Sequence, residues 1–235
     1  MKKFIYLGMP LAAILAAAIL IYIDSRSLEG EPAAVHQHSH TTNLPAGPEG
    51  EELARILEIE NILEDLEDAR LAIAFLGEIA QINIRNERYD GAGDATARLA
   101  SITQEFEDWK QAGDYFFEWL SYEEKLERQF HFASRAISAY QQALEVKPSD
   151  PDTYAVIGAV YGQMADYTNS ELFLRKALDV EPDHLFANFN MGVILHETEN
   201  KNKSISYLRR SLELARDTEY YGTVFGYLSQ IQNEL

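Results

Sequence analysis

A glycine recurs every 34 residues toward the C-terminal end of this sequence, at Gly158, Gly192 and Gly226. Four other columns keep the same interval. Prolines stand at Pro148 and Pro182, and small residues form two columns, Ala143, Ala177 and Ser211, and Ala136, Ser170 and Ser204. Bulky residues form the fourth, at Tyr140, Leu174 and Leu208. Self-similarity at a fixed period of this length is typical of solenoids, in which each unit packs on its neighbours. The period therefore predicts a stack of units with two short helices each.

The residue types in these columns indicate how the two helices of a unit meet. A glycine on the first helix lets the partner helix approach closely, and an alanine or serine on the second helix has the same effect. Large apolar residues such as Ile157, Leu174 and Leu178 fill the space around this contact. A helix of about 15 residues is marginal alone, so its stability comes from packing. A proline after the second helix ends it.

This arrangement resembles the tetratricopeptide repeat (TPR) family, whose pattern is W-x2-L-G-x2-Y, then A-x3-F, then P. Residues 151–184 and 185–218 follow the pattern, and residues 219–235 follow its first part, which predicts a lone capping helix. The matching residues are Tyr154, Ile157, Gly158 and Tyr161, then Asn188, Met191, Gly192 and Leu195, then Gly222, Phe225, Gly226 and Ser229. We interpret residues 106–150 as an enlarged repeat, because about three extra helical turns separate its two signatures.

Residues 51–70, which precede the repeats, read as an amphipathic helix that continues toward residue 86. Its apolar stripe has the spacing of a coiled-coil seam and consists of Ile56, Ile59, Leu63 and Leu66. Two interpretations stay open, dimerisation through this stem or packing on the following helices. Residues 71–105 are predicted to form a degenerate helical pair with Gly77 in its first helix.

An uncharged apolar run, Phe4–Ile23, lies near the start of the sequence, behind Lys2 and Lys3. Twenty helical residues span about 30 Å, the thickness of a bilayer core. We expect an uncleaved anchor rather than a cleaved signal peptide, whose apolar region is shorter. The positive-inside bias then keeps the N-terminus cytoplasmic. This predicts a single-pass protein of the cell inner membrane with a periplasmic, extracytoplasmic C-terminal domain.

The predicted fold class is all-α, with an N-terminal transmembrane helix followed by a TPR-like α-solenoid of antiparallel helix pairs. Residues 1–24 are the cytoplasmic N-terminus and the anchor, and residues 25–50 are a flexible linker rich in Gly, Pro, Ser and Thr. Residues 51–105 are the helical stem and degenerate repeat. Residues 106–235 are the TPR-like array with its capping helix.

Composition excludes several classes of function. The formal net charge is −18 and there is no cysteine, so nucleic acid is not expected as a partner, and thiol nucleophiles and thiolate metal sites are excluded. His196 and Glu197 begin like the zinc motif H-E-x-x-H, but residue 200 is asparagine. We predict no enzyme activity and no cofactor. Three linker histidines are either metal ligands or part of a solvated tether: His36, His38 and His40.

The resemblance implies that the first helices of the repeats line a concave protein-binding groove. Its residues here, carried over by position, are Phe186, Phe189, Val193, His196, Tyr220, Thr223 and Tyr227. Aromatic residues are favoured interface anchors, although neighbouring helices are an alternative cover for Phe186, Phe189 and Tyr227. The lysines and asparagines with which some members grip a C-terminal carboxylate are missing, since Ala155 and Ala159 stand at those positions. The acidic surface instead favours a basic or apolar partner segment.

Taken with the predicted anchor, these features indicate a non-enzymatic, membrane-anchored TPR adaptor or scaffold that mediates protein–protein interaction on the extracytoplasmic face. An assembly factor or chaperone of the cytochrome c maturation or translocon-associated type is the alternative. A structural subunit of a membrane complex is a further one. The layout is compatible with all three, because a fold does not fix a function.

Overall fold

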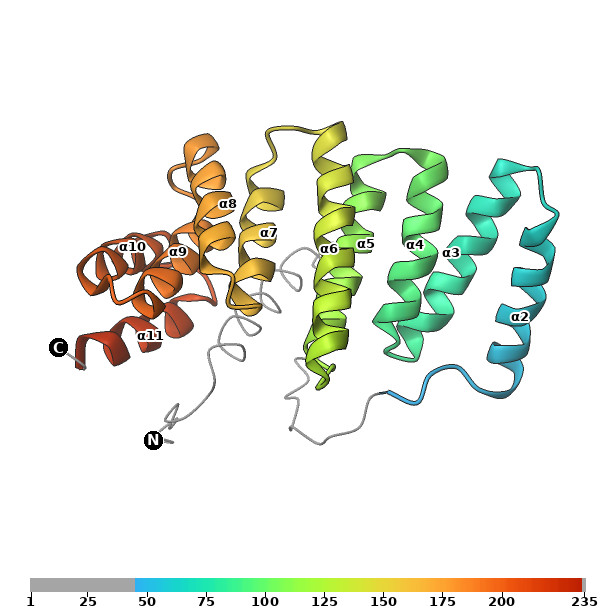
Figure 1. The fold of residues 1–235 in the computed structure, drawn as a ribbon, viewed down its shortest axis with the longest axis horizontal. Coiled ribbons are helices and arrows are strands. Elements are labelled where there is room, and N and C mark those ends of the chain that lie inside the picture. Colours follow the sequence, from blue (N-terminus) through green and yellow to red (C-terminus); the bar gives the residue numbers. More distant parts are fainter. Residues whose placement is uncertain (1–44, 234–235) are drawn as a thin grey trace. The chain divides into compact units, whose positions relative to one another are not determined.

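The computed structural model describes residues 45–233, which form ten α-helices and no strand within that range. Contacts divide them into two compact units, one of residues 45–153 and one of residues 154–233, with the boundary near the start of α7. Figure 1 shows the helices in chain order within each unit. They are α2 (Gly50–Glu64), α3 (Ala69–Arg85), α4 (Tyr89–Thr103), α5 (Phe106–Leu120), α6 (Leu126–Val146), α7 (Pro151–Gln163), α8 (Tyr167–Val180), α9 (Leu185–Glu197), α10 (Lys201–Leu214) and α11 (Tyr221–Asn233).

The predicted fold class needs a correction, because it included a transmembrane helix. Between residues 45 and 233, no helix has the length and apolar character needed to cross a membrane. The longest of them, α6, carries charges along its length, among them Arg128, Arg135 and Glu145. The span predicted at Phe4–Ile23 lies outside the described residues, as does most of the predicted linker. What the structure supports is an all-α helical repeat fold, and the four predicted domains stay predictions.

Two helical hairpins in residues 154–233 make the same contact around equivalent glycines. A Cβ placed on Gly158 would lie 2.7 Å from Leu174 Cγ, and one placed on Gly192 would lie 2.6 Å from Leu208 Cγ. In each hairpin a serine of the second helix donates a hydrogen bond to the glycine carbonyl, both at 2.7 Å, from Ser170 and Ser204 respectively. The close contact predicted from the glycine and serine columns is therefore confirmed for these two repeats.

The third glycine of the series has a different environment. Nothing lies within 4 Å of a Cβ placed on Gly226, and both this residue and the neighbouring Phe225 are exposed. No helix in the described range follows α11, so the face that takes α8 or α10 in the earlier repeats stays uncovered here. Gly226 thus shares the register of Gly158 and Gly192 but not their packing.

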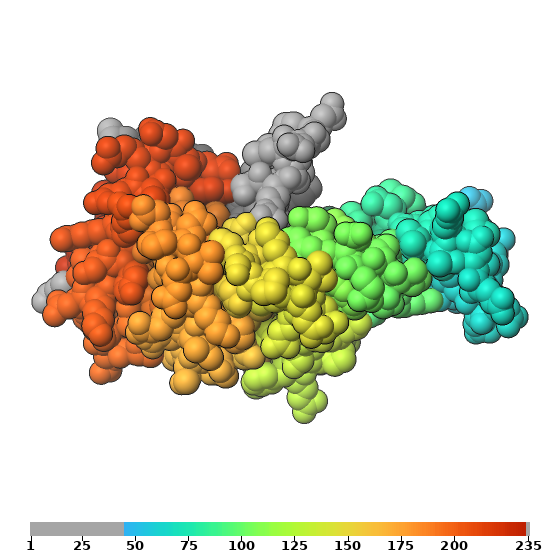
Figure 2. Space-filling view, turned by 90° about the horizontal axis from the view of Figure 1, so that it is seen from above, coloured from blue at the N-terminus to red at the C-terminus, as the bar shows by residue number. Residues whose placement is uncertain are grey.

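In residues 45–153, glycines also allow close contact between helices, but the facing side chains are larger. Gly113 of α5 faces the ring of Tyr140 on α6, and Gly93 of α4 faces the ring of Phe116 on α5, each with ring carbons within 2.7 Å of the position of a Cβ. Figures 1 and 2 show α3, α4, α5 and α6 succeeding one another side by side. The extra sequence of residues 106–150 lies mainly in α6, which has 21 residues where α8 and α10 have 14. Gly77, by contrast, makes no such contact.

Helix α2 packs on α3 and α4 through the stripe that also resembled a coiled-coil seam. Ile59 is fully buried against Ile79, Ala80 and Ala95, which favours the second of the two interpretations of the stripe. The predicted continuous helix to residue 86 is wrong, because it divides into α2 and α3. Asp68 accepts hydrogen bonds from the backbone N–H of the second and third residues of α3 and so starts a new helix.

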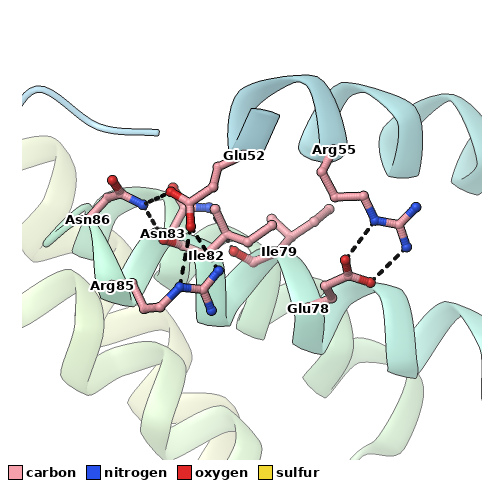
Figure 3. Close-up of polar contacts among 8 residues, drawn as sticks. All are labelled: Glu52, Arg55, Glu78, Ile79, Ile82, Asn83, Arg85 and Asn86. Atoms are coloured by element: carbon pink, nitrogen blue, oxygen red, sulfur yellow. Dashed lines mark hydrogen bonds and ion pairs between the residues drawn. The ribbon is translucent and has the colours of Figure 1, made fainter. Parts of the chain in front are cut away.

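Polar contacts also fix α2 along α3 (Figure 3). Arg55 donates two hydrogen bonds to the carboxylate of Glu78, one of 2.7 Å from Nε and one of 2.9 Å from Nη2. These bonds lower the pKa of Glu78 below its ordinary value. One turn earlier on α2, Glu52 accepts hydrogen bonds from Arg85 Nη2 at 2.9 Å and from Asn86 Nδ2 at 2.7 Å. The polar contacts and the apolar contacts of Ile59 therefore favour the same alignment of α2 along α3.

Candidate functional site

The seven residues of the predicted groove come from two helices and the turn before the second one. Four belong to α9, two belong to α11, and Tyr220 precedes α11. The structure brings their rings together in pairs. Phe186 meets Tyr220 with ring centroids 5.2 Å apart. Tyr227 meets Phe189 at 5.8 Å and His196 at 6.2 Å. The residues therefore form one aromatic seam between α9 and α11.

Burial divides this seam into two parts. Phe189, Val193, Tyr220 and Tyr227 are buried, so in this structure they belong to the packing of the unit. The half-buried members are Phe186, His196 and Thr223. The alternative interpretation, in which neighbouring side chains cover the aromatics, therefore describes Phe189 and Tyr227. As a binding site, the set of seven stays a prediction.

A histidine that the sequence analysis did not single out positions α9. His184 is buried, and its Nδ1 accepts a hydrogen bond of 3.1 Å from the backbone N–H of Ala187. The side chain thus caps the helix, as a serine or aspartate does more often. Asn188 also stabilises the start of α9, since its Nδ2 donates hydrogen bonds to the carbonyls of Pro182 and His184, both at 2.9 Å. These contacts orient the start of α9, which carries Phe186 and Phe189.

The unit of residues 45–153 holds a second group of functional interest, centred on Glu118 of α5. The ring of Tyr89, at the start of α4, lies 6.3 Å from the ring of Tyr115 and 5.8 Å from that of Tyr122, which follows α5. Tyr122 also stacks on Trp119 at 5.7 Å. We call Glu118 and its three tyrosines the Glu118 cluster. Sequence reasoning missed it, because its members come from different elements.

The electrostatics of the cluster are those of a poorly compensated carboxylate. Burial raises the pKa of Glu118 to about 7, with a further contribution from the nearby charge of Asp114. Burial first, then the charge of Glu118, raises the pKa values of Tyr89 and Tyr122. Burial likewise raises the pKa of Tyr115 to about 12.

The charged neighbours of the cluster already have partners. Asp114 accepts hydrogen bonds from Lys110 Nζ at 3.2 Å and from the hydroxyl of Tyr140 at 2.7 Å. Arg88 makes a two-point contact with Asp90, at 2.9 Å and 2.6 Å, and its guanidinium lies 5.2 Å from the ring centroid of Trp119. No residue in the described range makes a hydrogen bond or ion pair to the Glu118 carboxylate. Glu118 is thus the member of this group that lacks a cation.

Within residues 45–233, no three His, Cys, Asp or Glu residues are placed so that they could hold a metal ion. The candidate ligands His36, His38 and His40 lie outside that range, so their role stays a prediction.

The comparisons identify the repeats and the fold. A family model described as tetratricopeptide repeat matches residues 151–184 and 187–218, which confirms the two repeats predicted there. Among solved structures, TTC0263, a thermophilic TPR protein of Thermus thermophilus, is 14% identical, with 95% of this chain and 99% of that chain covered and a TM-score of 0.56. MamA is 16% identical, with 68% and 86% covered and a TM-score of 0.51. Comparison with curated proteins found no match. At these identities the likeness shows the fold alone.

Proposed function

We propose that this chain is a non-enzymatic adaptor that binds a segment of a partner protein. The observation that carries the proposal is the pair of tandem tetratricopeptide repeats at residues 151–184 and 187–218, since proteins built on this repeat bind other proteins. The fold is typically a scaffold rather than a catalytic centre. Nothing in the described residues indicates a reaction.

The chemistry of the partner follows from charge and from the accessible side chains. The formal net charge of −18 steers a basic segment toward the chain and repels an acidic one. On the predicted surface, Phe186 of α9 is a half-buried aromatic side chain, and Thr223 of α11 is a half-buried small one. We therefore propose a partner segment that is basic or apolar. The alternative roles as assembly factor or permanent subunit stay predictions, and so does the extracytoplasmic location.

Site-specific photocrosslinking tests the proposal. A photoreactive phenylalanine at Thr223 of α11 is half-buried on the predicted surface, and one at Lys203 of α10 is an exposed control elsewhere in the same unit. In cells of the source organism, the Thr223 probe should crosslink one protein reproducibly while the Lys203 probe does not. Equal crosslinking from both positions, or none from either, contradicts the adaptor function.

A further inference from the structure

We propose that the Glu118 cluster receives one cationic side chain, a lysine or arginine, of the partner segment. This inference rests on the proposed function and locates a contact for its basic partner in residues 45–153. The cluster consists of one carboxylate and three aromatic rings, and it comes from three segments: the start of α4, the last turns of α5 and the turn after α5. The combination provides both of the interactions that bind a cation, a counter-charge and ring faces.

The Glu118 carboxylate lacks the compensation that its acidic neighbours have. Loss of hydration makes the charge of a carboxylate costly unless a cation or hydrogen-bond donors compensate it. The other acidic groups nearby are compensated, Asp114 by Lys110 and Tyr140, and Asp90 by Arg88. Glu118 has no such partner among the residues that the structure describes. A cation brought by another protein would therefore gain more at Glu118 than at either neighbour.

The tyrosine rings of the cluster lie next to one another. Tyr89 contacts both Tyr115 and Tyr122, so the three rings are neighbours, and the charge of Glu118 acts on Tyr89 and Tyr122. The faces of tyrosine rings attract ammonium and guanidinium groups. A guanidinium additionally stacks on the rings and can bind a carboxylate through two hydrogen bonds. The neighbouring arginine shows this pattern within the chain, since Arg88 pairs with Asp90 and lies over Trp119.

The cluster is partly exposed to solvent. Glu118, Tyr89, Tyr115 and Tyr122 are all half-buried rather than buried, so each of them keeps some surface open to solvent. The surrounding charges also select a cation. Glu87 contributes negative charge at Tyr89 and Tyr122, and Asp114 does so at Glu118. An anion is repelled by all of these groups, and a purely apolar side chain would leave the carboxylate uncompensated.

Titration of the full chain with a defined peptide tests the site. The probe is a short acetylated and amidated peptide of serine and leucine with one central arginine, and its neutral counterpart carries citrulline instead. The readout is the indole N–H resonance of Trp119, which stacks on Tyr122. We expect saturable binding of the arginine peptide and binding of the citrulline peptide that is weaker by about tenfold or more.

Two isosteric variants separate this site from general attraction to an acidic protein. Glu118→Gln should weaken binding of the arginine peptide by about tenfold or more. Glu107→Gln removes the same charge from an exposed position of α5 and should change the affinity for this peptide by less than about twofold. Tyr89→Leu, which removes one ring face, should also weaken binding while far-ultraviolet circular dichroism stays that of the parent. Absence of binding to the parent chain, or equal losses in the two glutamate variants, overturns the proposal.

The crosslinking experiment keeps this inference distinguishable from the proposed function. If the Thr223 probe captures its partner but the arginine peptide does not bind, the adaptor function stands and the Glu118 site is rejected. If the peptide binds through Glu118 but neither probe captures a protein, the site stands and the adaptor function is rejected.

Discussion

Glu118 shows how an environment changes the chemistry of a single residue. Its pKa rises from the ordinary value of 4.5 to about 7, because burial and the charge of Asp114 disfavour the ionised form. Between these two pH values the folded chain holds a proton that the unfolded chain has released. The contribution of Glu118 to stability is therefore present at low pH and is lost as the pH rises through that window.

This linkage predicts a pH-dependent difference between the parent chain and Glu118→Gln. From pH 5 to pH 8, the unfolding free energy of the parent should fall relative to that of the variant, by something on the order of 2 kcal/mol. Urea unfolding at several pH values measures the difference. The facing groups, Asp114, Glu87, Tyr89 and Tyr122, are present in both chains. If the unfolding free energies of parent and variant depend on pH in parallel, the pKa of Glu118 is not raised in the folded chain.

The sequence does not single out this residue. Glu118 is one of 38 acidic residues, and its partners Tyr89 and Tyr122 belong to no shared motif. The only local signal is the aromatic run around it in residues 115–122. For the predicted seam, the repeat register places Phe189 and Tyr227 on facing helices, and their rings do meet. Their burial could not be predicted, because it depends on how closely α11 packs on α9.

At the scale of whole helices, glycine columns carry the hairpin contacts, and they do so only where a second helix is present. Gly192→Ala would place its methyl group 2.6 Å from Leu208 Cγ and 3.2 Å from the carbonyl oxygen of Ser204. Overpacking of this kind should destabilise the chain by about 1–3 kcal/mol. Thermal and urea unfolding measure the effect.

Gly226→Ala is the matched control, in the same register of the repeat. Its methyl group would meet nothing within 4 Å, and alanine is favoured over glycine inside a helix by about 0.5–1 kcal/mol. This variant should therefore be neutral or slightly more stable than the parent. Equal destabilisation by the two substitutions would mean that the glycines act through helix propensity and not through packing.

Helix α2 is predicted to depend on its ion pairs more than the repeat helices do. The pair of Arg55 and Glu78 joins α2 to α3 and is partly exposed, as is the pair of Arg98 and Glu60, so salt screens both. Arg55→Gln should speed hydrogen exchange of the α2 amides. Added sodium chloride should do the same in the parent chain.

Arg175→Gln serves as the control for α2, because Arg175 pairs with Glu171 inside α8. That variant should leave exchange in α2 unchanged. Were α2 exchange insensitive to both Arg55→Gln and salt, the apolar contacts of Ile59 would be sufficient to hold the helix.

The sequence predicts the helices of the repeats better than those that precede them. The period fixes the hairpins of residues 151–214, because small side chains at fixed positions determine where two helices touch. The break between α2 and α3 was missed, because a single cap at Asp68 interrupts a continuous apolar stripe. The distribution of the extra residues of the enlarged repeat was also not predictable. An insertion of whole turns preserves the faces of either helix, and the structure puts it mainly into α6.

For the molecule as a whole, net charge and local ion pairs predict opposite responses to salt. A formal net charge of −18 destabilises the compact state by self-repulsion, and this repulsion is screened when the Debye length falls to about 10 Å at 0.1 M salt. Global stability should therefore rise with sodium chloride although exchange in α2 becomes faster. Replacing three exposed acidic residues tests the cause: Glu124, Asp217 and Glu219.

With all three replaced by glutamine the net charge becomes −15, since each substitution removes one negative charge, and with all three replaced by lysine it becomes −12. None of the three forms an ion pair with another described residue, so no local contact is lost. The melting temperature at low salt should rise in the order parent, glutamine variant, lysine variant, and the gain from added salt should shrink in the same order. The graded series makes the test specific, because effects of helix propensity or ion hydration would not scale with net charge. A melting temperature that falls with salt in the parent would mean that ion pairs such as Arg55–Glu78 outweigh the repulsion, and the chain would then be held together by the contacts that salt weakens.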